Sequence, residues 1–383
     1  MTTTNLEVHE IRAVEDLHEM LRSPGPCLTL TLPAYHPGEQ ARSQGRFLKA
    51  SLQNAAIELR KRGVSPQATS ALLGPLQQLA EDPALLKGSA TGRIVFRSEN
   101  TLKEFVSTEP RTAALAVGSV FAIRPMLPEL TAPRVFYILA VARDRVSLKR
   151  CTGHFLENVD LPRGVPATLD DAMELEPPDH DLENRSAAGH AIGAIRRVRF
   201  GTGSGRETVH AHLSDFYKLV DRGICKMIHQ PGIPLVLAGV DEEVAAYRAI
   251  SGFPNLASES VHGSLDMPPA DMVARASTIL RREAELLAAD DVLDEKERGT
   301  PNHFLTEPAA ILRAAFEGRV HRLYLNEDAE RFGDHENASY RSWGREDLLN
   351  LAAVQTILHR GTVYELPGSM MPDSDVAAAV LRY

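Results

Sequence analysis

Apolar residues along the first third of the chain recur with helical and strand periods in turn. The segment 40–62 is the clearest case, because its apolar residues recur every three or four positions and Gly63 follows where a C-terminal cap of a helix belongs. The predicted elements are a helix over 11–22, a strand over 27–32, helices over 40–62 and 66–81, and strands over 92–97 and 102–107. Together they predict an α/β domain over residues 1–128.

The middle of the chain predicts a second α/β domain, over residues 129–267. A continuous apolar strand at 135–142 turns at Arg143-Asp144 into a strand at 145–151 whose residues alternate, which predicts a β-hairpin with one face toward solvent. After a polar stretch at 160–206, apolar residues at spacings of three and four predict a helix over 207–228. The run Pro234–Val240 shows no alternation and predicts a strand with helices covering both faces.

A third α/β domain is predicted over residues 268–383, after a break at 265–269 that contains two prolines. The predicted order is a helix over 270–289, a charged loop over 290–302, a helix over 307–316, a strand over 320–325, a helix over 346–359, a strand over 362–366 and a closing segment over 376–383. Helices that alternate with strands are typical of an α/β sandwich. The predicted fold class is therefore α/β, with three α/β domains in series.

The composition narrows the classes of function. A net charge of −9 argues against a surface covered by nucleic acid, because phosphate contacts need Lys and Arg, although one local basic patch remains compatible with it. Cys27, Cys151 and Cys225 are far apart and form no C-x-x-C pair, so we expect neither a disulfide framework nor a thiolate metal site. No signal peptide and no apolar run long enough to span a membrane is recognisable, which predicts a cytoplasmic protein without membrane contacts.

The polar stretch contains the most informative charge pattern. Seven acids and no Lys or Arg lie between Asp170 and Glu183. Five arginines and no acid follow: Arg185, Arg196, Arg197, Arg199 and Arg206. The glycines of Gly201-Thr-Gly-Ser-Gly205 allow close approach of the backbone, arginines pair with phosphate, and a helix N-terminus favours anions. The segment 185–206 is thus a candidate RNA-binding segment; the alternative is a surface loop whose charges are only solvated.

Other chemistry is less well supported. The spacing G-x-G-x-G fits neither a phosphate loop nor a dinucleotide fingerprint. His210 and His212 point about 200° apart on a helix, so one ion could not bind both. The carboxylates at 170–183 and 290–297 are interpreted as solvated loops. No catalytic residue, metal site or cofactor is predicted.

Three segments, in this order, resemble the archaeo-eukaryotic class-1 release-factor and Pelota family. Pro26–Pro33 and the helix after it are similar to the opening of the N-terminal domain, and Asp375–Tyr383 is similar to the closing strand. Phe200–Arg206, the helix after it and Pro234–Gly239 resemble the middle domain, in which a Gly-Gly-Gln loop precedes a long helix and an LVLAG strand. Arg124–Pro128 looks like the junction into the middle domain of bacterial members. The resemblance implies a release-factor/Pelota-like fold whose C-terminal domain is similar to the kink-turn-RNA-binding ribosomal-protein fold.

Departures from the family pattern bear on the activity. Aligning the glycines places Ser204 at the second catalytic Gly and Gly205 at the catalytic Gln. Because Gly205 has no side-chain amide, the resemblance implies that peptidyl-tRNA hydrolysis by the family mechanism is lost. No stop-codon element is recognisable near Leu52–Ala56. The RNA-binding residues implied are Arg185, Arg196, Arg197, Arg199, Gly201, Gly203, Ser204, Gly205 and Arg206.

The expected function is that of a ribosome-binding factor that occupies the A site, without hydrolysis, in ribosome hibernation or rescue. Its expected partner is the ribosome through ribosomal RNA, with tRNA and a translational GTPase as further candidates. Two alternatives stay open. One is a hydrolase of peptidyl-tRNA or RNA with a diverged loop, and the other is an adaptor that binds a translational GTPase.

Overall fold

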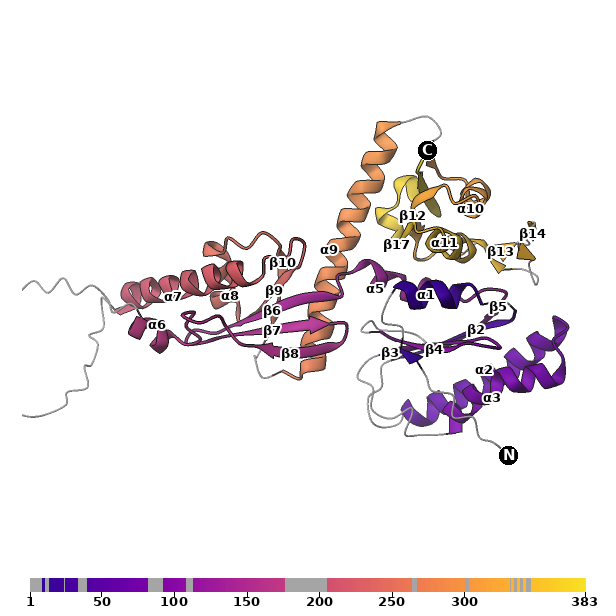
Figure 1. Ribbon diagram of the computed structural model, residues 1–383, viewed down its shortest axis with the longest axis horizontal. Coiled ribbons are helices and arrows are strands. Elements are labelled where there is room, and N and C mark those ends of the chain that lie inside the picture. The colour runs from indigo at the N-terminus through magenta and orange to yellow at the C-terminus, as the bar shows by residue number, and fades with distance from the viewer. Residues whose placement is uncertain are drawn as a thin grey trace, which may run out of the picture. The chain divides into compact units, whose positions relative to one another are not determined.

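The structure is a computed structural model that describes residues 9–10, 14–23, 25–33, 40–81, 92–107, 113–175, 205–263, 267–299, 303–330, 332–333, 336–337, 340–341 and 346–383. The chain divides into two compact units: unit 1 comprises Met1–Arg134 together with Ser277–Tyr383, and unit 2 comprises Val135–Ala276. Both units combine sheets with helices, so the predicted α/β class is confirmed (Figure 1). The domain boundaries at 128 and 267 stay a prediction.

The first sheet of unit 1 has the strand order β1-β4-β3-β2-β5. Its elements are β1 (His9–Glu10), α1 (Val14–Leu21), β2 (Cys27–Leu32), α2 (Gln40–Lys61), α3 (Pro66–Glu81), β3 (Gly92–Arg97), β4 (Leu102–Ser107) and β5 (Ala114–Gly118). Leu28 and Leu30 of β2 pack against α2 and α3, while Phe96 and Phe105 pack on the opposite face in a core that includes α1. Strands β2, β3 and β4 and helix α3 have the predicted bounds.

A buried arginine compensates for a proline inside α3. Pro75 has no N–H, so the carbonyl of Ala71 lacks its donor in the helix. Arg97 Nη2 donates to Ala71 O at 3.1 Å and Arg97 Nε donates to Leu72 O at 3.3 Å. Burial lowers the pKa of this guanidinium, whose acceptors are carbonyl oxygens, Thr101 O among them. Arg97 therefore fixes α3 on the sheet.

Unit 2 contains one sheet with the strand order β10-β9-β6-β7-β8. Its elements are β6 (Val135–Val141), β7 (Val146–Thr152), β8 (Phe155–Val159), α6 (Leu169–Leu175), α7 (Gly205–Met227), β9 (Leu235–Gly239), α8 (Asp241–Ile250) and β10 (Leu256–His262). Strands β6, β9 and β10 are parallel, whereas β6, β7 and β8 form an antiparallel meander. In β7 Val146 and Leu148 are buried and Ser147 is exposed, which confirms the predicted hairpin with one wet face.

The second sheet of unit 1 has the strand order β11-β18-β12-β17. Its elements are α9 (Pro269–Arg298), β11 (Phe304–Leu305), α10 (Pro308–Phe316), β12 (Val320–Asn326), α11 (Leu348–Leu358), β17 (Thr362–Leu366) and β18 (Ala377–Leu381). Short strands lie between β12 and α11: β13 (Phe332–Gly333), β14 (Glu336–Asn337), β15 (Tyr340–Arg341) and β16 (Glu346–Asp347). The closing segment forms β18, which lies between β11 and β12 and is buried along its length. The predicted closing strand is thus confirmed.

Two predicted loops are wrong. The chain remains helical in α9 as far as Arg298, where a charged loop was predicted from 290. Val292 and Glu295 are buried there, and Arg322 of β12 donates to Asp291 at 2.6 Å and to Glu295 at 2.7 Å. The start of the other acidic run, interpreted as a solvated loop, is helix α6. In α9 the charges belong to a helix that is paired to a sheet, and composition alone could not show the partner.

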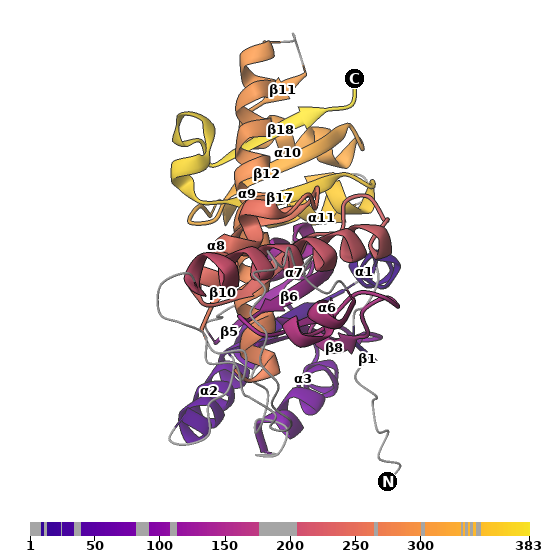
Figure 2. The same cartoon turned by 90° about the vertical axis from the view of Figure 1, so that its left-hand side faces the viewer.

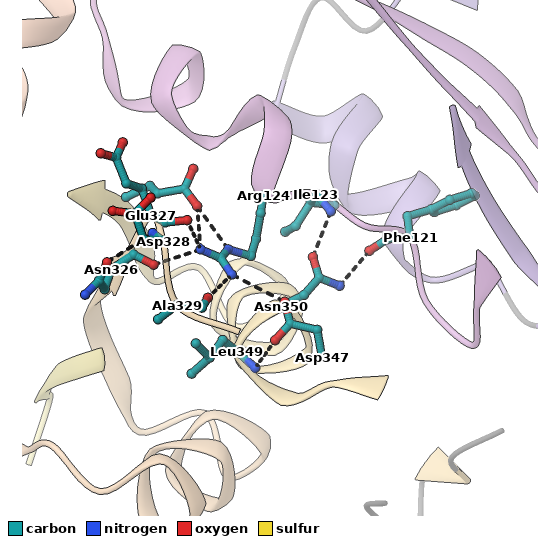
Figure 3. Close-up of polar contacts among 11 residues, drawn as sticks. Phe121, Ile123, Arg124, Asn326, Glu327, Asp328, Ala329, Asp347, Leu349 and Asn350 are labelled. Carbon is teal, nitrogen blue, oxygen red and sulfur yellow. Dashed lines mark hydrogen bonds and ion pairs between the residues drawn. The ribbon is translucent and has the colours of Figure 1, made fainter. Parts of the chain in front are cut away.

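The N-terminal and C-terminal parts of unit 1 are joined by polar contacts around the segment that precedes β6. This segment consists of η1 (Arg124–Met126) and α5 (Leu127–Thr131). The Arg124 guanidinium bonds to the carbonyl oxygens of Asn326, Glu327 and Ala329 and to the carboxylates of Asp347 and Glu365 (Figure 3).

Asn350 of α11 completes the connection. It accepts from Ile123 N at 2.8 Å and donates to Phe121 O at 2.9 Å (Figure 3). One hydrophobic core contains Leu17 and Phe96 from the N-terminal part and Leu323 and Ile357 from the C-terminal part. Segments on either side of unit 2 in the sequence are therefore packed into one body.

Candidate nucleic-acid interface

The predicted RNA-binding residues lie almost entirely outside the described residues. This applies to Arg185, Arg196, Arg197, Arg199, Gly201, Gly203 and Ser204. Gly205 and Arg206 are the first two residues of α7. The structure therefore defines the helices from which the segment starts and to which it returns, α6 and α7, and the assignment of the site residues stays a prediction.

Helix α7 is anchored on the sheet by an apolar row. Leu213, Phe216, Val220 and Ile224 are buried in the core of unit 2 with residues of β6, β7 and β9, which confirms the predicted face of this helix. Gly223 belongs to the same contact, because a Cβ there would lie 2.2 Å from Val165 Cγ2. A side chain at this position would push α7 away from the loop that precedes α6.

A buried carboxylate fixes α7 to the end of α8. Asp221 accepts from Ser251 Oγ at 2.6 Å, from Gly252 N at 2.9 Å and from Tyr247 Oη at 3.1 Å. Burial, and then the Asp221 charge, raises the pKa of Tyr247, so its hydroxyl stays a donor. Burial and the same carboxylate raise the pKa of the Cys225 thiol to about 11. The sequence pattern gave one hint of this anchor, since an acid stands directly beside Val220 on the apolar face.

Both α6 and α7 meet the sheet at the carboxyl end of β6. Tyr217 of α7 donates to Ala142 O at 3.1 Å, and Leu169 N of α6 donates to Asp144 O at 2.9 Å. The two helices lie side by side (Figure 1 and Figure 2). The segment 176–204 connects these two helices in the sequence.

The start of α6 is held by a reciprocal cap. Asp171 N donates to Thr168 Oγ1 and Thr168 N donates to Asp171 Oδ2, both at 3.1 Å. Ala172 of α6 is buried in the same core as Leu213 of α7. Asp170 and Asp171 make the first turn of α6 acidic.

In the described part of the chain, no three His, Cys, Asp or Glu side chains are grouped as a metal ion requires. His210 and His212 both belong to α7. Of the helices that the structure describes, none has the length and apolarity needed to cross a membrane.

The family model that matches the chain is that of bacterial archaeo-eukaryotic release factor family 3, over residues 135–319. The match includes the sheet of unit 2, the helices α6 and α7 on either side of residues 185–206, and the helices α9 and α10. This part of the chain is therefore similar to that family, and the ordered motifs at both ends of the chain resemble the wider release-factor/Pelota family.

Solved structures with detectable similarity have low identity to the chain. An archaeal translation termination factor, aRF1, is 15% identical, with 98% of this chain and 99% of that chain covered and a TM-score of 0.26. Pelota of Archaeoglobus fulgidus is 8% identical, with 98% and 94% covered and a TM-score of 0.37. Dom34 of S. cerevisiae, described as a translation termination-like factor that interacts with Hbs1, is 8% identical, with 98% and 94% covered and a TM-score of 0.31. No curated protein sequence matches the chain.

Proposed function

We propose that this protein is a ribosome-associated translation factor that occupies the A site and does not hydrolyse peptidyl-tRNA. Its role is to protect idle ribosomes or to rescue stalled ones. The segment 185–206 contacts ribosomal RNA, and the arginines of this segment bind phosphates. The proposal rests on the match of residues 135–319 to the model of bacterial archaeo-eukaryotic release factor family 3.

The non-hydrolytic role is inferred from the glycine at position 205. When the glycines of this chain are matched to the family's Gly-Gly-Gln motif, Gly205 takes the place of the catalytic Gln, and it is also the first residue of α7. A glycine provides a backbone N–H but no side-chain amide that could position a water. Anchored through Asp221, α7 can hold a binding segment without supplying the catalytic group.

Co-sedimentation tests the association. The purified chain is mixed with ribosomes from growing and from starved cells at low salt, and binding to at least one population is expected. A release assay on ribosomes with peptidyl-tRNA in the P site then tests the chemistry, and the peptide should remain on the tRNA. A chain that stays off both ribosome populations refutes the association. Peptide release refutes the non-hydrolytic role and favours the hydrolase.

The RNA-contacting segment has its own test. Replacing Arg196, Arg197 and Arg199 by Gln should flatten the dependence of log Kobs on log salt by about two to three units, because each phosphate contact contributes roughly 0.7–0.9. The matched control removes three cations from unit 1, with Arg60, Lys61 and Arg313 replaced by Gln, and should leave the slope close to that of the unmodified chain. An unchanged slope in the first variant would place 185–206 away from RNA.

Deletion of residues 185–206 distinguishes the proposed factor from the alternative, an adaptor whose C-terminal part binds a translational GTPase. An adaptor keeps its partner and its activity without this segment. The proposed factor loses most of its ribosome affinity.

A further inference from the structure

Helix α9 buries opposite faces in its two halves. Met272, Ala276 and Ile279 are buried in the first half, and Ala288, Val292 and Glu295 are buried in the second. Each residue of the second set lies sixteen positions after one of the first, which is about 160° around a helix with 3.6 residues per turn. The side of α9 that is buried in the first half is therefore exposed in the second half.

Along the exposed second half this line still carries large apolar residues. Leu286, Leu287 and Leu293 are 48%, 71% and 43% exposed. Leu286 and Leu293 lie seven and fourteen positions after Ile279, so they continue the row of that residue. Three leucines together on one surface helix are more than the single exposed apolar residues that soluble proteins commonly show.

Acids accompany these leucines. Asp290, Asp294 and Glu297 are exposed on the same half of α9, and within the described residues none of the three has an ion-pair partner. Neighbouring charges on the opposite side are paired, as in the contacts of Arg322 with Asp291 and Glu295. The face, which we call the α9 strip (Leu286, Leu287, Asp290, Leu293, Asp294 and Glu297), is both apolar and anionic.

We infer that the α9 strip is a docking surface for a basic amphipathic helix of a partner protein. The leucines provide apolar area for the partner's apolar side chains, and the three carboxylates attract flanking Lys or Arg. RNA is disfavoured as the occupant, because phosphates would meet three unpaired carboxylates. A second copy of the chain through the same face is disfavoured for the same reason, since the strip would oppose its own acids.

The chemistry of the surface is tested directly with a labelled helical peptide that has lysines on one face and leucines on the other. Fluorescence anisotropy with the full chain should show binding that weakens at least about tenfold when Leu286 and Leu293 are both replaced by Glu. It should weaken also when Asp290, Asp294 and Glu297 become Asn, Asn and Gln. Ile57→Glu, at a 52% exposed position of α2, is the matched control and should not change the affinity. Equal affinity for all four chains, or for a peptide with Glu in place of Lys, overturns the inference.

A second arm uses ribosomes and rests on the proposed function. If the strip contacts a basic ribosomal protein, the amide variant should bind ribosomes more weakly than the unmodified chain. Tighter binding would mean that the strip faces RNA, and unchanged binding would mean that it lies outside the complex; either result overturns its role on the ribosome. If the unmodified chain does not bind ribosomes, the proposed function fails, and the peptide titration alone decides whether the docking surface exists.

Discussion

Asp221 should determine how firmly α7 is held on the sheet. Its carboxylate accepts hydrogen bonds from Ser251, Gly252 and Tyr247. Hydrogen bonds to a charged group contribute about 1.5–3 kcal/mol each, but they share one buried acceptor and do not add. Asp221→Ala leaves three neutral donors unsatisfied, at about 1–3 kcal/mol for each one that stays buried, and we expect a loss of about 3–5 kcal/mol in the free energy of unfolding of unit 2. Asp221→Asn keeps one acceptor oxygen but turns its amide toward Gly252 N, so about 1–3 kcal/mol should be lost.

Native-state hydrogen exchange on the full chain resolves this effect, because it reports the opening free energy of each segment separately. Protection of the amides in α7 and β9 should fall in the order Tyr247→Phe, Asp221→Asn, Asp221→Ala. A cycle that combines Asp221→Ala with Tyr247→Phe should show a coupling of about 0.5–3 kcal/mol. Protection in β2 and β3, which belong to unit 1, is the internal control. Equal protection of α7 in all variants would refute the anchoring role of Asp221.

Three further predictions concern other contacts of the fold. Arg97→Met should lower the free energy of unfolding by about 3 kcal/mol, measured by urea unfolding followed by circular dichroism. Adding Pro75→Ala to this variant should restore part of the lost stability, because alanine returns an N–H to α3. Gly223→Ala should destabilise by about 1–2 kcal/mol despite its better helix propensity, and Val165→Ala should relieve the clash; additive effects would contradict this. Burial raises the pKa of the Cys151 thiol from 9.0 to about 12, so the unfolded chain loses its proton first. The free energy of unfolding should therefore decline above about pH 9 by about 1.4 kcal/mol per unit more than in Cys151→Ala, and parallel pH profiles would contradict this.

The most accurate predictions from sequence concern the helices and strands whose apolar residues recur regularly and whose ends carry turn-forming residues. Strands β2, β3, β4 and β17 and helix α3 were predicted with the bounds that the structure shows. The apolar row of α7 was likewise visible in the spacing of its residues. Such patterns are local, and no knowledge of the partner surface is needed to recognise them.

What escaped prediction depends on contacts between distant segments. Residues 290–298 of α9 carry many charges and therefore predict a loop, but the buried Val292 packs against the second sheet of unit 1. Strand β8 is only five residues long and pairs with β7, while helix α8 carries four charges in ten residues and packs against β9. The acceptors of Arg124 lie more than 200 positions away in the sequence, so no local pattern could identify them.

The candidate site was predicted from charge and family pattern, and the structure adds the rigid base beneath it. The sequence places an acid at Asp221 beside the apolar face, but its hydrogen-bond donors could not be recognised, because they come from α8 and the residues after it. The edge of the sheet at which α6 and α7 meet was also hidden, since it depends on the parallel pairing of β6 with β9. These features describe the helices on either side of the candidate RNA-binding segment.

Occupancy of the A site without hydrolysis can be tested by a cryo-EM map of ribosomes incubated with the full chain, with peptidyl-tRNA bound in the P site. Density for the protein is expected in the A site, with residues 185–206 against ribosomal RNA near the tRNA acceptor end and the peptide still attached. Density for the protein elsewhere on the ribosome, or a P-site tRNA that has lost its peptide, would refute this role.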